Sequence, residues 1–224
     1  MMIIGHRGAR GHSPENTIAS FQKVILMNVG AIEFDVHLSA DGEIIVIHDE
    51  TVDRTTAGKG LVKEMTLQLL GELRIDGRHK IPTLSQVFDL DEKIVMNVEL
   101  KVAETAEPVV KLIEEYVNNR HRNYGQFLVS SFDWNALQNV RKLNPEIPLG
   151  VLTYTDLDLA IGFAEHIDAE TIHPHFHLLT SENTAMMQQK GFKVFTWTVN
   201  EPEDIAMIKS FSPDGIITDF PDRI

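Results

Sequence analysis

Residues 31–49 read AIEFDVHLSADGEIIVIHD, two apolar strand-like runs joined by the turn Asp41-Gly42. Asp-Gly between β-rich runs is a common hairpin signal, and the connection is far too short for a crossover between parallel strands. We therefore expect the second run to return antiparallel to the first. That return would bring His48, at its end, back over Glu33 and Asp35 of the first run.

The rest of the chain alternates short apolar strands with helical segments. The expected strands are residues 2–5, 31–36, 94–100, 127–131, 149–153, 171–173, 193–199 and 215–218. The expected helices are residues 14–29, 83–90, 106–120, 134–143, 156–165, 181–190 and 202–210. Strands separated by helices form a parallel sheet, and eight of them favour an α/β fold of the TIM (β/α)8 barrel type. Active sites of such barrels lie at the carboxyl ends of the strands.

We expect one barrel domain over residues 1–224, a length within the usual range for this fold. Residues 37–82 would form a small insertion after the second strand that could wall the pocket. After the eighth strand only residues 219–224 remain, so the last helix should be truncated or missing. The flank left uncovered is the hypothesised contact surface of a homo-oligomer.

Composition narrows the classes of function. A net charge of −13 argues against nucleic-acid binding and against anionic membranes, and the lack of cysteine excludes a disulfide framework or a thiolate zinc site. No apolar segment approaches the ~20 residues that span a bilayer, and the N-terminus lacks a signal-peptide pattern. We therefore expect a cytoplasmic protein without membrane insertion, whose anionic substrate is attracted by local positive charge.

Three carboxylates indicate a metal site. Glu33 and Asp35 are two residues apart on a strand, so their side chains share a face, where they repel each other unless a cation lies between them. Glu99 repeats this pattern on the next barrel strand, with Lys101 on the same face. Oxygen ligands favour Mg²⁺ or Ca²⁺ over zinc. The alternative is that these groups are solvated charges at strand ends.

Two histidines could supply acid and base. His6 directly follows the first strand and His48 ends the returning hairpin strand, and imidazole titrates near neutrality. A lone histidine among apolar residues is more often structural, but two beside a carboxylate cluster favour catalysis. Arg7 has the planar fork that grips phosphate oxygens. Asp49 could orient His48 or belong to a turn.

Two further residues are candidates for substrate binding. Ser13 and Pro14 are typical of an N-cap and a first helical position, which places Asn16 in a helix N-terminal turn facing the barrel mouth, where an anion could be held. Trp197 lies on the seventh strand, where its indole could floor the pocket or simply fill the barrel core.

The run His173-Pro174-His175-Phe176-His177 suggests a zinc site of the amidohydrolase type. It lies late in the chain, a proline interrupts it, and no other nitrogen-rich cluster joins it. Pocket lining or surface is the favoured interpretation of these histidines.

Several motifs follow one another in order between Gly5 and Pro221: His6-Arg7-Gly8, Pro14-Glu15-Asn16-Thr17, Glu33-Phe34-Asp35-Val36, Asp41-Gly42, His48-Asp49 with Arg54-Thr55-Thr56, Glu99-Leu100-Lys101, Thr196-Trp197-Thr198-Val199-Asn200, and Asp214-Gly215-Ile216-Ile217-Thr218-Asp219. This ordered set resembles the signature of the glycerophosphodiester phosphodiesterases, a family of phospholipase C-like barrels. The resemblance covers nearly the whole chain.

The resemblance implies metal-dependent hydrolysis of glycerophosphodiesters to sn-glycerol 3-phosphate and an alcohol. One histidine would deprotonate the glycerol 2-hydroxyl, the other would protonate the departing alcohol, and water would open the resulting cyclic phosphate. The residues it implies are His6 and His48 as acid and base, Glu33, Asp35 and Glu99 as ligands of one divalent cation, and Arg7 and Lys101 as phosphate contacts. Alternatives are phospholipase D-type action on lysophospholipids, a non-catalytic barrel that binds glycerol phosphate, and a zinc amidohydrolase.

Overall fold

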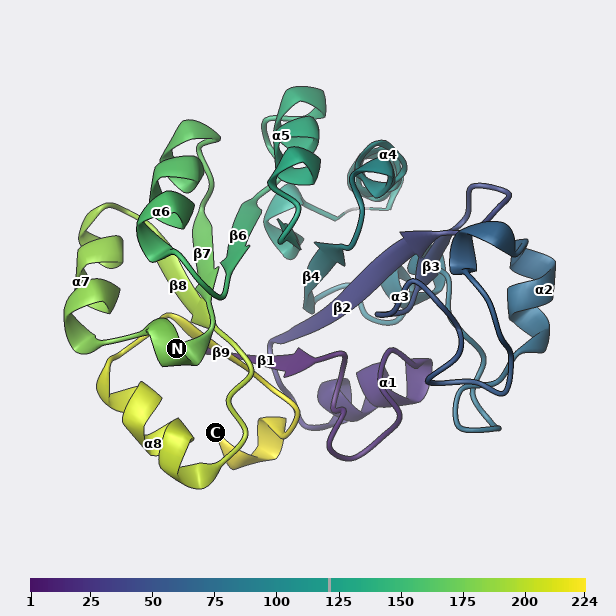
Figure 1. Ribbon diagram of the computed structural model, residues 1–224, viewed down its shortest axis with the longest axis horizontal. Helices are drawn as coiled ribbons and strands as arrows, with labels where there is room; N and C mark the ends of the chain where they lie inside the picture. The colour runs from purple at the N-terminus through teal and green to yellow at the C-terminus, as the bar shows by residue number, and fades with distance from the viewer. Residues whose placement is uncertain (121) are drawn as a thin grey trace.

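Eight parallel strands close into a barrel in the computed structural model, which describes residues 1–120 and 122–224 (Figure 1). Going round the barrel, neighbouring strands pair in the order β1, β2, β4, β5, β6, β7, β8 and β9, and β9 pairs with β1. The strands are β1 Met2–His6, β2 Ala31–Leu38, β4 Val95–Leu100, β5 Phe127–Ser131, β6 Leu149–Thr153, β7 Thr171–Pro174, β8 Lys193–Thr196 and β9 Gly215–Thr218. The predicted TIM barrel is confirmed.

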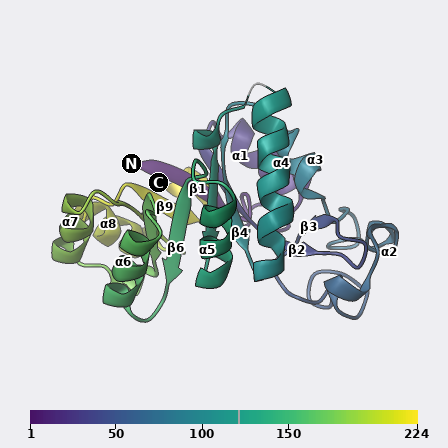
Figure 2. The same ribbon diagram turned by 90° about the horizontal axis from the view of Figure 1, so that it is seen from above.

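Helices surround the barrel, as the view from above also shows (Figure 2). They are α1 Ile18–Leu26, α3 Leu84–Phe88, α4 Ala106–Asn119, α5 Trp134–Leu143, α6 Leu157–His166, α7 Ser181–Gln189 and α8 Pro202–Ser210. Most begin at a Thr or Asp whose side chain accepts a hydrogen bond from a backbone N–H of the first turn, which satisfies a donor that the helix itself leaves free.

The predicted start of the first helix is wrong. The helix begins at Ile18, and its N-cap is Thr17 rather than Ser13, since the Thr17 hydroxyl accepts a hydrogen bond from the Ser20 N–H. Asn16 has a φ of 55°, a left-handed conformation that cannot continue a right-handed helix. Its N–H donates instead to the carbonyl of Arg7, which ties this turn to the end of β1.

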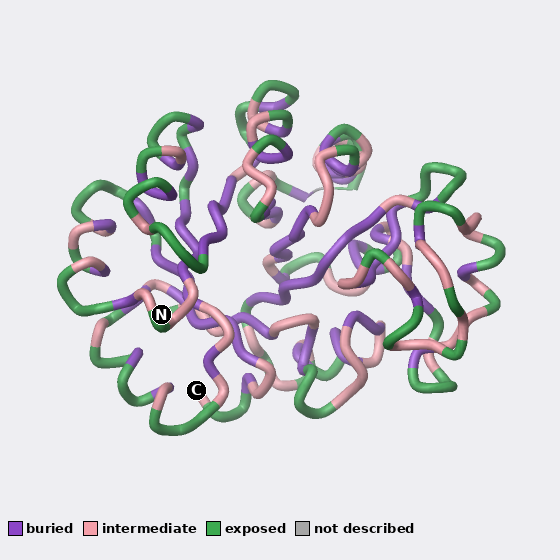
Figure 3. Tube along the Cα trace, in the orientation of Figure 1, coloured by how far each residue is buried: buried purple, intermediate pink, exposed green. Residues whose placement is uncertain are grey.

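The alternation of β2 divides the protein into an apolar shell and a polar barrel interior. Ile32, Phe34 and Val36 point outward into the main hydrophobic core between barrel and helices, the buried layer of Figure 3. Glu33 and Asp35 occupy the intervening positions on the inner face. The base of the interior is closed by the apolar cluster Ile4, Ala31, Leu128, Phe195 and Ile217. Buried apolar side chains contribute about 1.5–3 kcal/mol each to stability. The free energy from this core therefore offsets the cost of burying polar groups near the barrel mouth.

The hairpin forms as predicted. β3, Ile44–Val46, runs antiparallel to β2 with Val36 opposite Val46, and Gly42 takes the positive φ of 84° that the turn requires. The chain then continues through a 3-10 turn, Val62–Glu64, and α2, Leu67–Glu72, before rejoining the barrel at α3. This segment lies beside β2 and has a small apolar core of its own, made of Ile45, Ile47, Val52, Val62, Leu70, Ile75 and Ile81 (Figure 1).

The last described residues of the chain lie against the loop that follows β1. β9 is followed only by a 3-10 turn, Pro221–Arg223. This turn packs on the β1–α1 loop: the Gly11 N–H donates to the Asp219 carbonyl, and His12 lies 2.6 Å from Asp222. Among the described helices, none combines the length and the apolar character needed to cross a membrane.

Candidate active site

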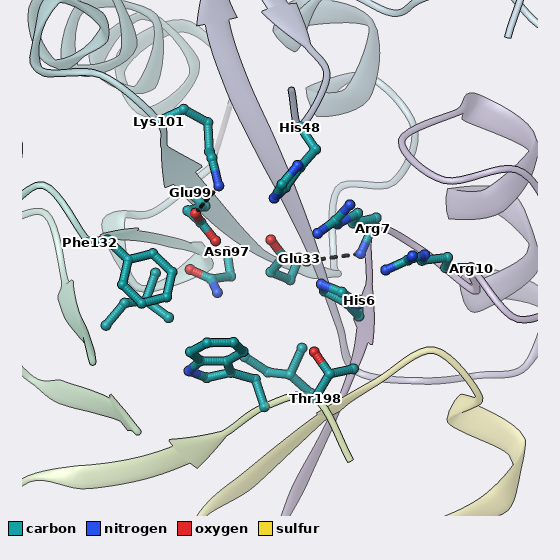
Figure 4. A pocket seen from close by; sticks show the side chains of 13 residues that line it. His6, Arg7, Arg10, Glu33, His48, Asn97, Glu99, Lys101, Phe132 and Thr198 are labelled. Atoms are coloured by element: carbon teal, nitrogen blue, oxygen red, sulfur yellow. Dashed lines mark hydrogen bonds and ion pairs between the residues drawn. The ribbon is translucent and has the colours of Figure 1, made fainter. Parts of the chain in front are cut away.

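A cavity opens at the carboxyl ends of the barrel strands, and most of the predicted site residues line it (Figure 4). One side is polar and charged, and the other is apolar. The lining residues are His6, Arg7, Arg10, Glu33, His48, Asn97, Glu99, Lys101, Phe132, Leu152, Trp197, Thr198 and Ile217. Arg10, Asn97 and Phe132 among them were not predicted.

The floor of the charged side is a buried carboxylate triad of Glu33, Asp35 and Glu99. One oxygen of each lies within 4.8 Å of the others. β2 supplies the first two, and β4 supplies Glu99 directly opposite Asp35. The sequence-based grouping of these three residues therefore has the geometry of a cation site.

Burial and mutual repulsion dominate the electrostatics of the triad. Burial, together with the charges of Asp35 and Glu99, raises the pKa of Glu33 well above its usual value, and burial and Asp35 raise the pKa of Glu99 to about 7. Burial also opposes ionisation of Asp35, but Arg7 and Lys101 outweigh it and lower its pKa to about 2. The nearby positive charges are therefore too few to keep all three carboxylates ionised at their usual pKa values.

These residues fit a hard divalent cation. All the ligating atoms are oxygens, and Glu33 Oε1 is buried without a hydrogen-bond partner among the described residues. The other oxygen of Glu33 accepts the Arg7 N–H at 2.9 Å, which fixes the orientation of the carboxylate. A cation between the three carboxylates would satisfy the orphaned oxygen and relieve the repulsion.

His6 is oriented by Asp219. Its Nδ1 lies 2.6 Å from Asp219 Oδ1, and Asp219 is held in turn by the side-chain amide of Asn200 at 2.9 Å. Burial lowers the pKa of His6, although Asp219 acts in the opposite direction. Because Nδ1 donates to the carboxylate, Nε2 is left to exchange a proton. Asp219 belongs to the motif that ends the last barrel strand, and no role was predicted for it; its position just after that strand was the available signal.

His48 has the same arrangement on the insertion. Its Nδ1 lies 2.6 Å from Asp49 Oδ1, so Asp49 orients the imidazole. The His37 ring donates from Nε2 to the carbonyl of His48 at 3.1 Å and ties that residue to β2. Burial lowers the pKa of His48, against the influence of Asp35.

Arg54 joins the insertion to the barrel loops. Its guanidinium donates to Asp49 at 2.6 Å and, through two nitrogens, to Glu15 at 2.7 and 3.0 Å. Glu15 also accepts from Arg7 at 2.8 Å. Burial disfavours the ionisation of Glu15, but Arg54 and Arg7 outweigh burial and lower its pKa to about 2. One carboxylate therefore connects the loop of Arg7 with the loop of His48.

The predicted phosphate contacts lie beside the triad. Arg7 Nε is 3.4 Å from Asp35 Oδ2, and Lys101 Nζ is 2.6 Å from Glu99 Oε1 and 3.5 Å from Asp35 Oδ1. Both side chains line the cavity, and Figure 4 shows them on either side of His48.

Asn16 and Trp197 differ in their placement. The prediction that Asn16 lies at the barrel mouth is wrong: it is buried, is not part of the cavity lining, and its side-chain amide donates to Asp35 Oδ2 at 2.9 Å. Its left-handed backbone turns the side chain down onto the triad. Trp197 does line the cavity, and its indole N–H donates to the His173 carbonyl at 2.8 Å.

The histidines of the late run do not form a metal site. His173 is fully buried inside the barrel, where its Nε2 lies 2.8 Å from Thr171 Oγ1 and burial lowers its pKa to about 3. The prediction of pocket lining or surface is wrong for this residue, because β7 turns it inward over Gly150, whose missing side chain leaves the space. Within the described part of the chain, the carboxylate triad alone has metal-site geometry.

Comparison with known proteins agrees with this geometry. Residues 6–223 match the model of the glycerophosphoryl diester phosphodiesterase family. The chain belongs to this family. It is 35% identical to a glycerophosphodiester phosphodiesterase from Caldanaerobacter subterraneus subsp. tengcongensis, over 100% of this chain and 96% of the relative. The sequence-based resemblance is confirmed, and the chain is an enzyme of the glycerophosphodiester phosphodiesterase class.

Solved structures of glycerophosphodiester phosphodiesterases share the fold. A phosphodiesterase from Oleispira antarctica, in complex with the product sn-glycerol-3-phosphate, has a TM-score of 0.90 and 27% identity and covers 100% of this chain and 95% of that one. A putative glycerophosphoryl diester phosphodiesterase from Silicibacter pomeroyi has a TM-score of 0.89 and 30% identity, with coverage of 100% and 91%.

Proposed function

We propose that this protein hydrolyses glycerophosphodiesters such as glycerophosphocholine and glycerophosphoethanolamine to sn-glycerol 3-phosphate and an alcohol. The observation that carries the proposal is the pairing of two carboxylate-oriented histidines, His6 and His48, around one buried carboxylate triad. The product named for the Oleispira antarctica structure supports the glycerol phosphate part of the substrate.

Each histidine has its Nδ1 paired with a carboxylate, so it can take up or release one proton at Nε2. The proton of the glycerol 2-hydroxyl passes to one imidazole while its oxygen bonds to phosphorus; the bond to the alcohol oxygen breaks, and the other imidazole protonates that oxygen. A water molecule then gives its proton to the second imidazole and its oxygen bonds to phosphorus. The 2-oxygen leaves with the proton held by the first. Both histidines, His6 and His48, end as they began.

The remaining charged residues of the site would bind the cation and the phosphate. Glu33, Asp35 and Glu99 would hold one divalent cation, Mg²⁺ or Ca²⁺, which supplies Lewis-acid stabilisation of the charge that develops on the phosphate. Arg7 and Lys101 face the same volume and bind phosphate oxygens.

Two other residues complete the proposed site. Trp197 forms part of its apolar floor. Asn16 acts as a positioning residue for Asp35 through its amide hydrogen bond. We further propose that residues 1–224 work as one catalytic domain in which the insertion, about residues 37–82, delivers His48 to the barrel.

Replacing Asp219 by asparagine should lower kcat by about 10²–10⁴-fold, the scale seen when a histidine loses the carboxylate that fixes its tautomer. Since the Asp219 carboxylate favours the charged imidazolium, its removal should also shift the pKa of His6 further below its ordinary value. Steady-state kinetics and an NMR titration of His6 measure the two effects. Asp222→Asn, on the same terminal segment but paired with His12, is the matched control. An unchanged kcat would remove Asp219 from the proposed mechanism.

A substrate panel tests the reaction itself. Glycerophosphocholine, glycerophosphoethanolamine and lysophosphatidylcholine are each incubated with the enzyme and Mg²⁺, Ca²⁺ or a chelator, and released sn-glycerol 3-phosphate and choline are measured. We expect turnover of the two glycerophosphodiesters that stops on chelation and returns with added cation. Turnover confined to lysophosphatidylcholine would instead establish phospholipase D-type activity, and no turnover of any substrate would favour a binding barrel.

A further inference from the structure

The apolar side of the cavity continues outward as a string of aromatic rings. Trp197 meets Phe132 edge to face with ring centroids 5.3 Å apart, and Phe132 meets Tyr154 with centroids 5.6 Å apart. Trp197 is partly buried, Phe132 is 37% exposed and Tyr154 is 64% exposed. The string therefore leads from the cavity floor to the surface.

Exposure of these rings is unusual for this protein. Among the large apolar side chains that the described residues expose, Phe132 and Tyr154 are the aromatic ones, and they adjoin each other at the cavity mouth. Tyr154 has most of its surface in water and therefore adds little to the core. The loops after β5 and β6 thus present these two rings where a bound molecule would touch them.

The two arginines that line the cavity lie on the side away from the aromatic rings, and Lys101 is paired with Glu99. Figure 4 shows Phe132 across the cavity from Arg7 and Arg10. The loops that carry the aromatic rings, residues 132–133 and 154–156, contain Asp133 and Asp156 and no lysine or arginine. The loop after β7 adds His175, whose ring meets Trp197 edge to face with centroids 4.9 Å apart; burial, and then His177, lower the pKa of His175.

This division matches a zwitterion. The phosphate and the glycerol 2-hydroxyl must reach His6, His48 and the triad, so the alcohol that leaves extends toward the mouth. There it meets aromatic rings on loops that carry no lysine or arginine, an environment that accepts a positive charge, and quaternary ammonium groups bind well against aromatic rings. A zwitterionic substrate also avoids the repulsion that a net charge of −13 exerts on an anion.

We propose that Phe132 and Tyr154 form a head-group subsite for the quaternary ammonium of choline-type glycerophosphodiesters. This inference rests on the proposed function and extends it to the alcohol half of the substrate. The two residues determine specificity and take no part in proton transfer.

A neutral analogue isolates the charge. Glycerophosphocholine is compared with the diester of 3,3-dimethylbutanol, in which carbon replaces the ammonium nitrogen, and released sn-glycerol 3-phosphate is measured with both. The wild type should favour the choline diester about three- to tenfold in kcat/KM, the range of a cation–π contact at partly exposed rings. Tyr154→Ala and Phe132→Leu should bring that ratio toward one, and Tyr154→Phe, which keeps the ring, should preserve it.

Leu143→Ala, which truncates an exposed apolar side chain at the end of α5, is the control and should leave the ratio unchanged. Competitive inhibition by tetramethylammonium chloride, measured against sodium chloride at equal ionic strength, should weaken in Tyr154→Ala. A wild-type ratio near one, or a ratio that survives both ring-removing variants, would overturn the subsite. Hydrolysis of neither diester would overturn the proposed function, and the subsite with it.

Discussion

Replacing His48 by alanine should reduce kcat by about 10²–10⁴-fold while cation binding persists, and His6→Ala should do the same. Each imidazole has one carboxylate on Nδ1 and lines the cavity from a different side, so neither can substitute for the other. Neither ring belongs to the carboxylate triad, so the cation site keeps its oxygen ligands. Turnover of glycerophosphocholine and calorimetric titration with Mg²⁺ or Ca²⁺ measure the two properties separately.

His166→Ala, on the exposed surface of α6, provides the matched control and should have wild-type kinetics. A variant of His6 or His48 that bound cation normally and still turned over at the wild-type rate would exclude that residue as acid or base. A variant that lost both properties would show that the imidazole also maintains the shape of the triad, and the proton-transfer role would then need a different substitution, such as glutamine.

The barrel and the core of the site could be predicted because both follow local sequence rules. Alternation along β2 places Glu33 and Asp35 on one face whatever the rest of the chain does. The Asp41-Gly42 turn allows the hairpin only one direction of return, which brings the chain of His48 back over that face. These features depend on neighbours a few residues apart.

The parts that could not be predicted depend on contacts between distant segments. Asp219 reaches His6 across 213 positions, and Arg54 reaches Glu15 across 39. The periodicity of apolar residues along a helix or strand gives no information about such distant pairs. The start of α1 was misplaced for a related reason: the Asn16 N–H donates to Arg7, and this contact overrides the local preference of Ser13-Pro14 for a helix start.

Several motif residues do not take part in the reaction but hold the reacting residues in position; we call them frame residues. Glu15 and Arg54 join the loop of Arg7 to the loop of His48, and Asn16 holds Asp35. The insertion has its own small apolar core, so its position relative to the barrel depends on such contacts. Substrate-facing and frame residues therefore appear together in one motif, which a sequence pattern alone cannot separate.

Replacing Glu33 by glutamine should abolish cation binding and turnover and yet stabilise the metal-free protein. Glutamine has the same shape and can still accept the Arg7 N–H, but it removes a carboxyl group whose ionisation is opposed in the folded protein by burial and by Asp35 and Glu99. In chelator, the Tm of Glu33→Gln should exceed that of the wild type. Cation at 100 times its Kd should stabilise the wild type by about 2.7 kcal/mol, a Tm rise of roughly 5–10 °C, and should leave the variant unchanged.

Differential scanning calorimetry with and without Mg²⁺ or Ca²⁺ measures both effects, and Glu115→Gln, on the exposed side of α4, controls for the loss of any carboxylate. The two expected shifts have opposite signs and one cause. If Glu33, Asp35 and Glu99 were merely solvated strand-end charges, the variant would gain no stability in chelator. If the cation bound elsewhere, the variant would keep the Tm rise. Only a cation held by the buried triad produces a more stable metal-free variant that no longer responds to metal.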